Sequence, residues 1–418
     1  MTLHISTDRR LVRAGAQSTR YLRVRFTAPE APRHGERLPL DVALVIDKSG
    51  SMGGGKLELA KMAARRAVEL LGPRDHVALV AYDTEVELLA AGALLDPSHQ
   101  RRLLTAIDHL HTGSSTNLSG GWLLGCEEVG RAGREGTVAR TLLLSDGLAN
   151  AGITDVEALK THAGELRARG VATSTFGIGS DFDERLMEGM ARAGGGNFYY
   201  LQRPEQIPEF LMSELGEALE VVARGAVLTV EVEPGIMIAS LDDRRTTRNG
   251  STVEIALDDL VSRQQMELVL RVTFPRGAVG VTKGMSVRLT DRDGVLQVRP
   301  VWMDWEYADH DANDAQRRDE EVDLAVAQRY AARAREEAAE LNRAGDLERA
   351  RGVLLATARR IKEYAGHNPQ MLELVRELER TAVRHRDRLE GSALKDERFM
   401  AYNIREAKSL LGRKLRSP

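Results

Sequence analysis

Cysteine, aromatic residues and long apolar runs are all scarce in this 418-residue chain. The single cysteine, Cys126, excludes an internal disulfide and suits a reducing compartment. No stretch approaches the roughly 20 apolar residues that a membrane-spanning helix needs. The first ten residues also lack an apolar core of the length found in signal peptides. We therefore expect a cytoplasmic protein without a membrane span.

A strong net charge is absent as well. The chain has 59 basic and 62 acidic residues, which gives a net charge of −3. That balance creates no field over the whole molecule that would attract nucleic acid, so we expect no nucleic-acid partner. Hydrophobic residues make up 42% and aromatic residues only 4%, so the cores must consist mainly of aliphatic side chains. The length favours two or three domains.

Short apolar runs alternate with helix-like segments from residue 41 to 222. Val42–Ile46, His76–Tyr82 and Thr141–Leu144 are typical of strands that are buried on both faces. Lys56–Leu71 carries apolar residues at helical spacing, and Pro208–Val222 is the closing helix of the series. The alternation predicts an α/β domain with a doubly wound, mostly parallel sheet. Such sheets bind ligands just beyond the carboxyl ends of their strands.

Different patterns flank this region. Residues 223–307 contain five strand-like runs, which predict an antiparallel β-sandwich: Val227–Val232, Thr252–Ala256, Met266–Phe274, Met285–Leu289 and Val295–Trp302. Residues 1–40 hold two more β-like runs and a proline-rich linker, Pro29–Pro39, and we expect these N-terminal strands to join the sandwich. Residues 308–418 are rich in Ala, Glu and Arg and predict an α-helical C-terminal region.

Three segments place oxygen-bearing side chains where strands and helices meet. Asp47, Ser49 and Ser51 occupy alternate residues directly after the first central strand. Thr116 precedes a helix in Gly-Ser-Ser-Thr-Asn-Leu, and Asp146 follows a core strand in Leu-Ser-Asp-Gly. The three loops should lie at the same edge of the sheet. Hydroxyls and carboxylates are hard donors, which suit Mg²⁺ and are poorly suited to zinc or copper.

Together these segments resemble the von Willebrand factor type A fold with its metal-ion-dependent adhesion site, over about residues 41–222. The resemblance implies that Ser49, Ser51 and Thr116 bind the metal directly or nearly so, whereas Asp47 and Asp146 act through water. It implies Mg²⁺, with Mn²⁺ or Ca²⁺ as alternatives. It also implies one open coordination position, which an Asp or Glu of a partner protein fills.

The layout, with β elements on both sides of the α/β region, is similar to that of bacterial relatives of the calcium-activated chloride channel regulators and inter-alpha-trypsin-inhibitor heavy chains. Intracellular members of the family often work beside AAA+ ATPases or in multiprotein assemblies. The resemblance therefore implies a protein–protein interaction module and no enzymatic activity.

Three further sequence patterns could indicate phosphate binding, transition-metal binding or catalysis. Gly50–Lys56 fits the phosphate-binding pattern Gly-x₄-Gly-Lys, but Leu57 stands where that motif needs Ser or Thr. His109 and His111 could bind a transition metal, although no third ligand lies nearby in the sequence. A Mg²⁺-dependent hydrolase or phosphotransferase is the alternative function, with His111 and Asp83 as candidate general bases. The partner, the pathway and the oligomeric state stay open.

Overall fold

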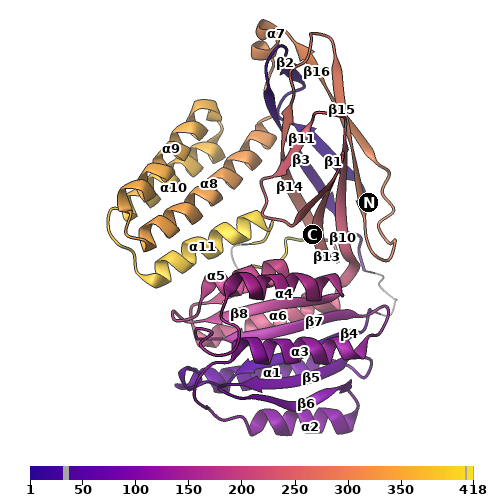
Figure 1. Cartoon of the computed structure of the whole chain (residues 1–418), viewed down its shortest axis with the longest axis vertical. Helices are drawn as coiled ribbons and strands as arrows, with labels where there is room; N and C mark the ends of the chain where they lie inside the picture. Colours follow the sequence, from indigo (N-terminus) through magenta and orange to yellow (C-terminus); the bar gives the residue numbers. More distant parts are fainter. Residues whose placement is uncertain (32–36, 410–411, 418) are drawn as a thin grey trace. The chain divides into compact units, whose positions relative to one another are not determined.

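A computed structural model describes residues 1–31, 37–409 and 412–417, and the chain divides into two compact units (Figure 1). The inserted unit comprises Ala31–Val221, and the outer unit comprises Met1–Glu30 together with Val222–Pro418. Part of the predicted linker Pro29–Pro39, residues 32–36, lies outside the described residues.

The inserted unit is built on a six-stranded sheet with the order β6-β5-β4-β7-β8-β9. Only β6 runs antiparallel to its neighbour. The strands β4, β7 and β8 are buried along nearly their whole length. The bounds are β4 (Leu40–Asp47), β5 (His76–Tyr82), β6 (Val86–Leu94), β7 (Val138–Ser145), β8 (Val171–Ile178) and β9 (Gly195–Leu201). The prediction of a mostly parallel α/β sheet is confirmed.

In the described part of this unit, six α-helices and two short 3₁₀ turns lie between these strands or follow the last of them. They are η1 (Gly50–Met52), α1 (Lys56–Leu70), α2 (Pro97–Asp108), α3 (Leu118–Ala132), α4 (Val156–Ala168), α5 (Glu184–Ala193), η2 (Pro204–Gln206) and α6 (Ile207–Leu219). The helix α3 packs very closely on the sheet, because a Cβ atom at Gly125 would lie 2.4 Å from Cγ2 of Val45. Small residues on the inner face of α3 thus let the helix lie close to the strands, which places its N-terminus beside the strand ends.

The outer unit contains the predicted β-sandwich, which is antiparallel except where β2 pairs with β16 in parallel. One sheet has the order β1-β3-β14-β11 and the other the order β12-β13-β10-β15-β16-β2, and their inner faces share one apolar core. The strands are β1 (Leu3–Thr7), β2 (Leu11–Arg13), β3 (Ser18–Thr27), β10 (Val221–Val232), β11 (Met237–Ser240), β12 (Thr246–Asn249), β13 (Thr252–Val261), β14 (Gln265–Phe274), β15 (Thr282–Thr290) and β16 (Val301–Ala308). The strand β3 pairs with β14 over ten residues, so the N-terminal segment is central to the first sheet.

Several element boundaries differ from the sequence prediction, and two of these differences have a local physical cause. The last strand begins at Val301 rather than at Val295. The reason is the carboxylate of Asp291, which accepts hydrogen bonds from the backbone N–H groups of Val295 (3.1 Å) and Leu296 (2.7 Å) and so folds this stretch into a loop. The closing helix ends at Leu219 rather than at residue 222, and the β-branched pair after Glu220 begins β10.

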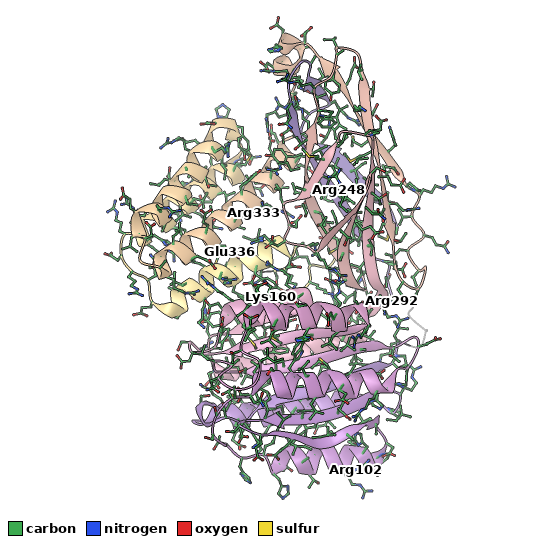
Figure 2. All side chains as sticks on the ribbon, viewed as in Figure 1. Arg102, Lys160, Arg248, Arg292, Arg333 and Glu336 are labelled. Carbon is green, nitrogen blue, oxygen red and sulfur yellow. The ribbon has the colours of Figure 1, made fainter. Side chains whose placement is uncertain are left out.

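The C-terminal region is helical up to Arg405. Its helices are α7 (His310–Ala315), α8 (Glu320–Arg343), α9 (Leu347–Ala365), α10 (Pro369–Arg384) and α11 (Gly391–Arg405). Arg333 of α8 donates to the carbonyl of Ser240, and Glu336 of the same helix pairs with Arg405 (Figure 2). After α11 the chain returns to the sandwich, where Arg416 and Gln264 form an isolated antiparallel β-bridge. Among the described residues, no helix is both long enough and apolar enough to cross a bilayer.

A buried ion pair fastens α6 to the sheet of the inserted unit. Glu214 of α6 is completely buried and accepts hydrogen bonds at 2.6 Å from Arg140, Ser174 and Asn197, and at 2.7 Å from Tyr199. Burial by itself raises the pKa of Glu214, but the Arg140 guanidinium and the hydrogen-bond donors outweigh it and hold that pKa well below its usual value. The carboxylate therefore joins α6 to β7, β8 and β9.

We expect Glu214→Ala to lower the free energy of unfolding by about 3–5 kcal/mol, because Arg140 is left as an uncompensated buried charge. Urea denaturation of the full chain measures the change. Glu209→Ala, an exposed position on the same helix, is the matched control and should change the stability by no more than about 0.5 kcal/mol. Equal effects at both positions would contradict the structural role of Glu214.

The same carboxylate makes stability depend on pH. Its pKa is lowered on folding, so its contribution is complete above the unfolded value of 4.5 and is lost as the pH falls below it. The loss should be about 1.4 kcal/mol per pH unit in that range. Glu214→Gln removes this titration, so its free energy of unfolding should fall less steeply below pH 4.5 than that of the wild type. Parallel acid limbs in urea denaturation would contradict the assignment.

Candidate metal site

Asp47 is the last residue of β4 and has no exposed surface. One of its carboxylate oxygens accepts the backbone N–H of Ser49, and the other accepts the hydroxyl of Ser145, both at 2.8 Å. Burial raises the pKa of Asp47 to about 6, so the group is still ionised at neutral pH. The side chain is thus held in one orientation at the carboxyl end of the central strand.

Ser49, Ser51 and Asp146 meet directly beyond this strand end. The hydroxyl oxygens of Ser49 and Ser51 are 3.0 Å apart. The hydroxyl of Ser51 also donates to Oδ1 of Asp146 at 2.6 Å, which joins two loops 95 residues apart in the sequence. Asp146 follows β7 and is completely buried. Two of the three predicted segments are therefore in contact.

Thr116 brings the third segment to the same place. Its Oγ1 atom and the Oγ atom of Ser51 both lie 3.6 Å from the point where a Cβ atom on Gly147 would stand. The backbone N–H of Thr116 donates to Oδ1 of Asn150 at 2.9 Å, which ties this loop to the loop after β7. The Thr116 side chain is almost completely buried. The five predicted residues therefore lie around one small region at the sheet edge.

The spacing of these oxygens fits a hard divalent cation. Neighbouring ligands of octahedral Mg²⁺, with bonds of 2.0–2.1 Å, are about 2.9 Å apart. The Ser49–Ser51 oxygen distance of 3.0 Å matches such an edge. The donor set is three hydroxyls and two carboxylates, and no softer donor belongs to it. The described residues hold no group of three or more His, Cys, Asp or Glu side chains that could bind a metal ion, and this site itself has only two carboxylates.

Lys56 is part of this region, although the sequence did not assign it there. It stands at the start of α1, and its Nζ atom donates to Oδ2 of Asp146 at 2.5 Å. The side chain is 24% exposed, whereas Asp146 is completely buried. One positive charge of the chain itself therefore offsets part of the negative charge of the two aspartates.

Two further residues support the predicted ones. Asn150 accepts hydrogen bonds from the backbone of Thr116 and from the hydroxyl of Ser115 (2.7 Å), so Ser115 is already engaged. Ser145 orients Asp47, as described above. Asparagine in a polar turn and serine at a strand end are common, and nothing in the local sequence distinguishes these two residues from structural ones.

The residues behind the alternative hypotheses have other contacts. Asp83 pairs with Lys48 at 3.0 Å and accepts the backbone N–H of Glu85 at 2.9 Å. Burial acts to raise the pKa of Asp83, but these two contacts outweigh it and lower that pKa, which is opposite to the shift that suits a general base at neutral pH. Lys56, the lysine of the phosphate-binding pattern, is paired with Asp146. His111 is exposed.

Comparison with known proteins agrees with this architecture. Among curated proteins, the uncharacterized protein YfbK of Escherichia coli is 31% identical over 48% of this chain and 35% of its own length. The uncharacterized protein sll0103 of Synechocystis is 26% identical over 64% of each chain, and human inter-alpha-trypsin inhibitor heavy chain H4 is 26% identical over 41% of this chain and 19% of its own length. The chain thus spans less than two thirds of each of these relatives.

Two solved structures share the fold of most of the chain. A von Willebrand factor type A protein from Catenulispora acidiphila matches with a TM-score of 0.70 and 15% identity, over 100% of this chain and 97% of that one. The ArnB paralog VWA2 from Sulfolobus acidocaldarius matches with a TM-score of 0.55 and 19% identity, over 91% and 97%. The family model of the von Willebrand factor type A domain matches residues 41–213. Residues 41–213 therefore form a von Willebrand factor type A domain, as the resemblance in the sequence implied.

Proposed function

We propose that this domain is a divalent-metal-dependent protein–protein interaction module. Ser49, Ser51 and Thr116 would bind Mg²⁺ directly, and Asp47 and Asp146 would hold its water ligands. When bound, the ion supplies a coordination position that a carboxylate of a partner protein can fill. The observation that carries this proposal is the contact of the Ser51 hydroxyl with both Ser49 (3.0 Å) and Asp146 (2.6 Å).

The charges of the site support an acidic partner group. Asp47 and Asp146 contribute two negative charges, and Lys56 contributes one positive charge within hydrogen-bond distance of Asp146. A divalent cation therefore leaves the site with a net positive charge, which favours an incoming Asp or Glu side chain. In this proposal Lys56 weakens the affinity for metal and strengthens the attraction for the partner.

An exposed apolar side chain adjoins the site. Leu148 lies two residues after Asp146, and 56% of its surface is exposed. A large aliphatic side chain beside a charged site is a natural contact for a partner, because its burial is worth about 1.5–3 kcal/mol. We therefore propose that the acidic residue of the partner has an apolar neighbour that packs on Leu148.

We also propose the compartment in which this interaction takes place and the kind of partner that it involves. A single buried cysteine suits the reducing conditions of the cytoplasm. Family members in that compartment work beside AAA+ ATPases or in larger assemblies, and a partner of that kind is the one we propose. An enzymatic role has less support, because Asp83 is paired with Lys48, and Asp47 is fully buried with its two oxygens accepting the Ser49 N–H and the Ser145 hydroxyl.

The metal site can be tested through two substitutions with opposite effects. Ser51→Ala removes a proposed direct ligand. Since loss of an outer-shell partner alone costs about 10–100-fold in metal affinity, this change should cost at least about 100-fold. Lys56→Met removes a positive charge beside the ion and should raise the affinity about tenfold. Isothermal titration with Mg²⁺ and Mn²⁺ measures both changes.

Lys61→Met on the same helix is the matched control, since Lys61 pairs with Glu58 rather than with the site. It should leave the affinity for metal unchanged. A wild-type chain that takes up neither ion would overturn the proposed function. A wild type that binds metal, with no change in the Lys56→Met variant, would leave the metal site intact and remove only the role of Lys56.

Partner binding can be separated from metal binding through Leu148. Immobilised wild-type chain should retain its partner from a lysate with Mg²⁺ and release it in EDTA, and Ser51→Ala should retain none. Leu148→Ser should bind Mg²⁺ as the wild type does but lose about tenfold in partner affinity, because it removes apolar contact without changing the charge of the site. A partner that stays bound to wild type and Ser51→Ala alike in EDTA would show that the metal has no part in recognition.

A further inference from the structure

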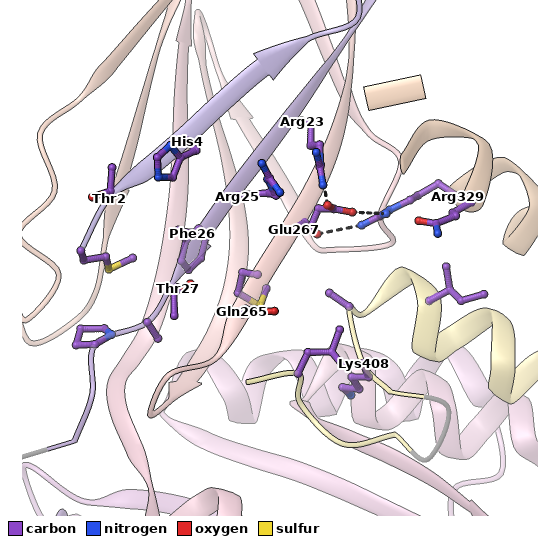
Figure 3. Close-up of a pocket in the computed structure, with 18 of the residues that line it drawn as sticks. Thr2, His4, Arg23, Arg25, Phe26, Thr27, Gln265, Glu267, Arg329 and Lys408 are labelled. Atoms are coloured by element: carbon purple, nitrogen blue, oxygen red, sulfur yellow. Dashed lines mark hydrogen bonds and ion pairs between the residues drawn. The ribbon is translucent and has the colours of Figure 1, made fainter. Parts of the chain in front are cut away.

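A cavity of about 1080 Å³ is lined by residues of the outer unit alone, and none of them belongs to the metal site (Figure 3). Its floor is the outer face of β1, β3 and β14, and its walls come from α8, α10, α11 and the residues after α11. The volume is at the upper end of the 300–1,000 Å³ that is typical of small-molecule pockets. The cavity therefore has room for a ligand as large as a peptide segment.

The floor follows the two-residue repeat of the strands. His4, Arg25 and Glu267 are direct cross-strand neighbours on one face of the sheet. The residues between them, such as Phe26, point into the sandwich core on the other face. Threonine and glutamine side chains extend the same floor at Thr27 and Gln265, which are paired across β3 and β14. The floor thus offers hydrogen-bonding groups at strand spacing.

Positive charge exceeds negative charge among the side chains that line the cavity. The permanent cations are Arg23, Arg25, Arg329, Arg335 and Lys408. The carboxylates are Glu267 and Glu377. These cations come from β3, from α8 and from the segment after α11, and Figure 3 shows Arg25 and Lys408 on different elements rather than gathered at one point. A single phosphate or sulfate is bound by donors that converge, so this arrangement suits a ligand with several separated negative groups.

Some of these cations serve the fold. Arg329 is buried and donates to Asp242 (3.0 Å) and to Glu267 (2.8 Å), which fastens α8 to the sheet. Arg23 donates to Glu267 (2.7 Å) and to Glu321 (2.6 Å). The guanidinium groups of Arg23 and Arg329 thus already form short ion pairs within the protein, and we assign neither to ligand binding.

Arg25 is placed differently. Its side chain is 49% exposed, and its carboxylate neighbour, Oε2 of Glu321, is 3.5 Å away and already accepts Arg23 at 2.6 Å. Such an exposed pair contributes at most about 1 kcal/mol, so a ligand carboxylate can replace it at little cost. His4 lies beside Arg25 on the floor, and Lys408 lines the cavity from the segment after α11.

Apolar side chains also line the cavity. Leu374 of α10 and Ile404 of α11 belong to the helical walls, and Leu415 lies beside the floor, where its carbonyl accepts the backbone N–H of Gln265 at 2.8 Å. An extended peptide presents alternate side chains on opposite sides, so its acidic residues can face the strands while its apolar residues face these helices. We propose that this cavity binds an extended acidic peptide segment of a partner protein, with its carboxylates at Arg25, His4 and Lys408. This second binding site does not depend on the metal site.

The test uses the full chain and a short fluorescein-labelled peptide of alternating glutamate and leucine, followed by fluorescence anisotropy in EDTA. We expect binding that weakens as NaCl is raised, because exposed charges are screened. The double variant Arg25→Glu, Lys408→Glu should bind at least about tenfold more weakly. Arg359→Glu, the same charge change at an exposed position of α9 outside the cavity, should bind like the wild type.

Four results would overturn the proposal. They are binding that requires Mg²⁺, equal binding of the matched glutamine–leucine peptide, undiminished binding by the double variant with an unchanged melting temperature, and displacement of the peptide by low concentrations of inorganic phosphate. If the double variant melts early, Arg25→Gln replaces it, since this exposed side chain contributes little to the fold. Its affinity should then fall about threefold or more, and an unchanged affinity would count against the site.

Discussion

Asp47 and Asp146 stand at one sheet edge because β4 and β7 pair in parallel, with Ile46 opposite Leu144. In that register Asp47, the last residue of β4, lies level with Ser145, the last residue of β7, and Asp146 follows immediately. Backbone hydrogen bonds then fix the third loop, since Gly113 donates to Lys48 (2.6 Å) and Gly50 donates to the carbonyl of Ser114 (3.0 Å). Without the parallel register, the hydroxyls and carboxylates would have no common position.

Much of the fold could be predicted because its patterns are long and repeated. Buried strands such as Val42–Ile46 and the amphipathic helices between them are visible in the sequence alone. The errors fall where one polar contact decides the local structure, as at Asp291, whose carboxylate binds backbone N–H groups and replaces a strand by a loop. Glu214 could not be recognised either, because a glutamate on a helix is normally solvated and its buried partners come from three different strands.

Most residues of the candidate site could also be predicted from the sequence, because their spacing and their position at strand ends form a recognisable pattern. A motif with fixed spacing marks Asp47, Ser49 and Ser51, and the strand ends mark Thr116 and Asp146. Lys56 was overlooked because its contact with Asp146 joins residues 90 positions apart, and its neighbours suggested a phosphate-binding turn instead. The cavity of the outer unit has no local pattern at all, since it arises where the sheet and the helical layer separate.

The pairing of β3 with β14 has a consequence for synthesis of the chain. Arg23 and Glu267, which form an ion pair between these two strands, are 244 residues apart, so β3 leaves the ribosome on the order of ten seconds or more before its neighbour exists. During that interval the inserted unit, which is continuous in sequence, can complete its own sheet. Until β14 is synthesised, Leu22, Val24 and Phe26 of β3 stay exposed to solvent. The arginines that alternate with them place positive charge along the unpaired edge of β3, and that charge opposes edge-to-edge association with other nascent chains.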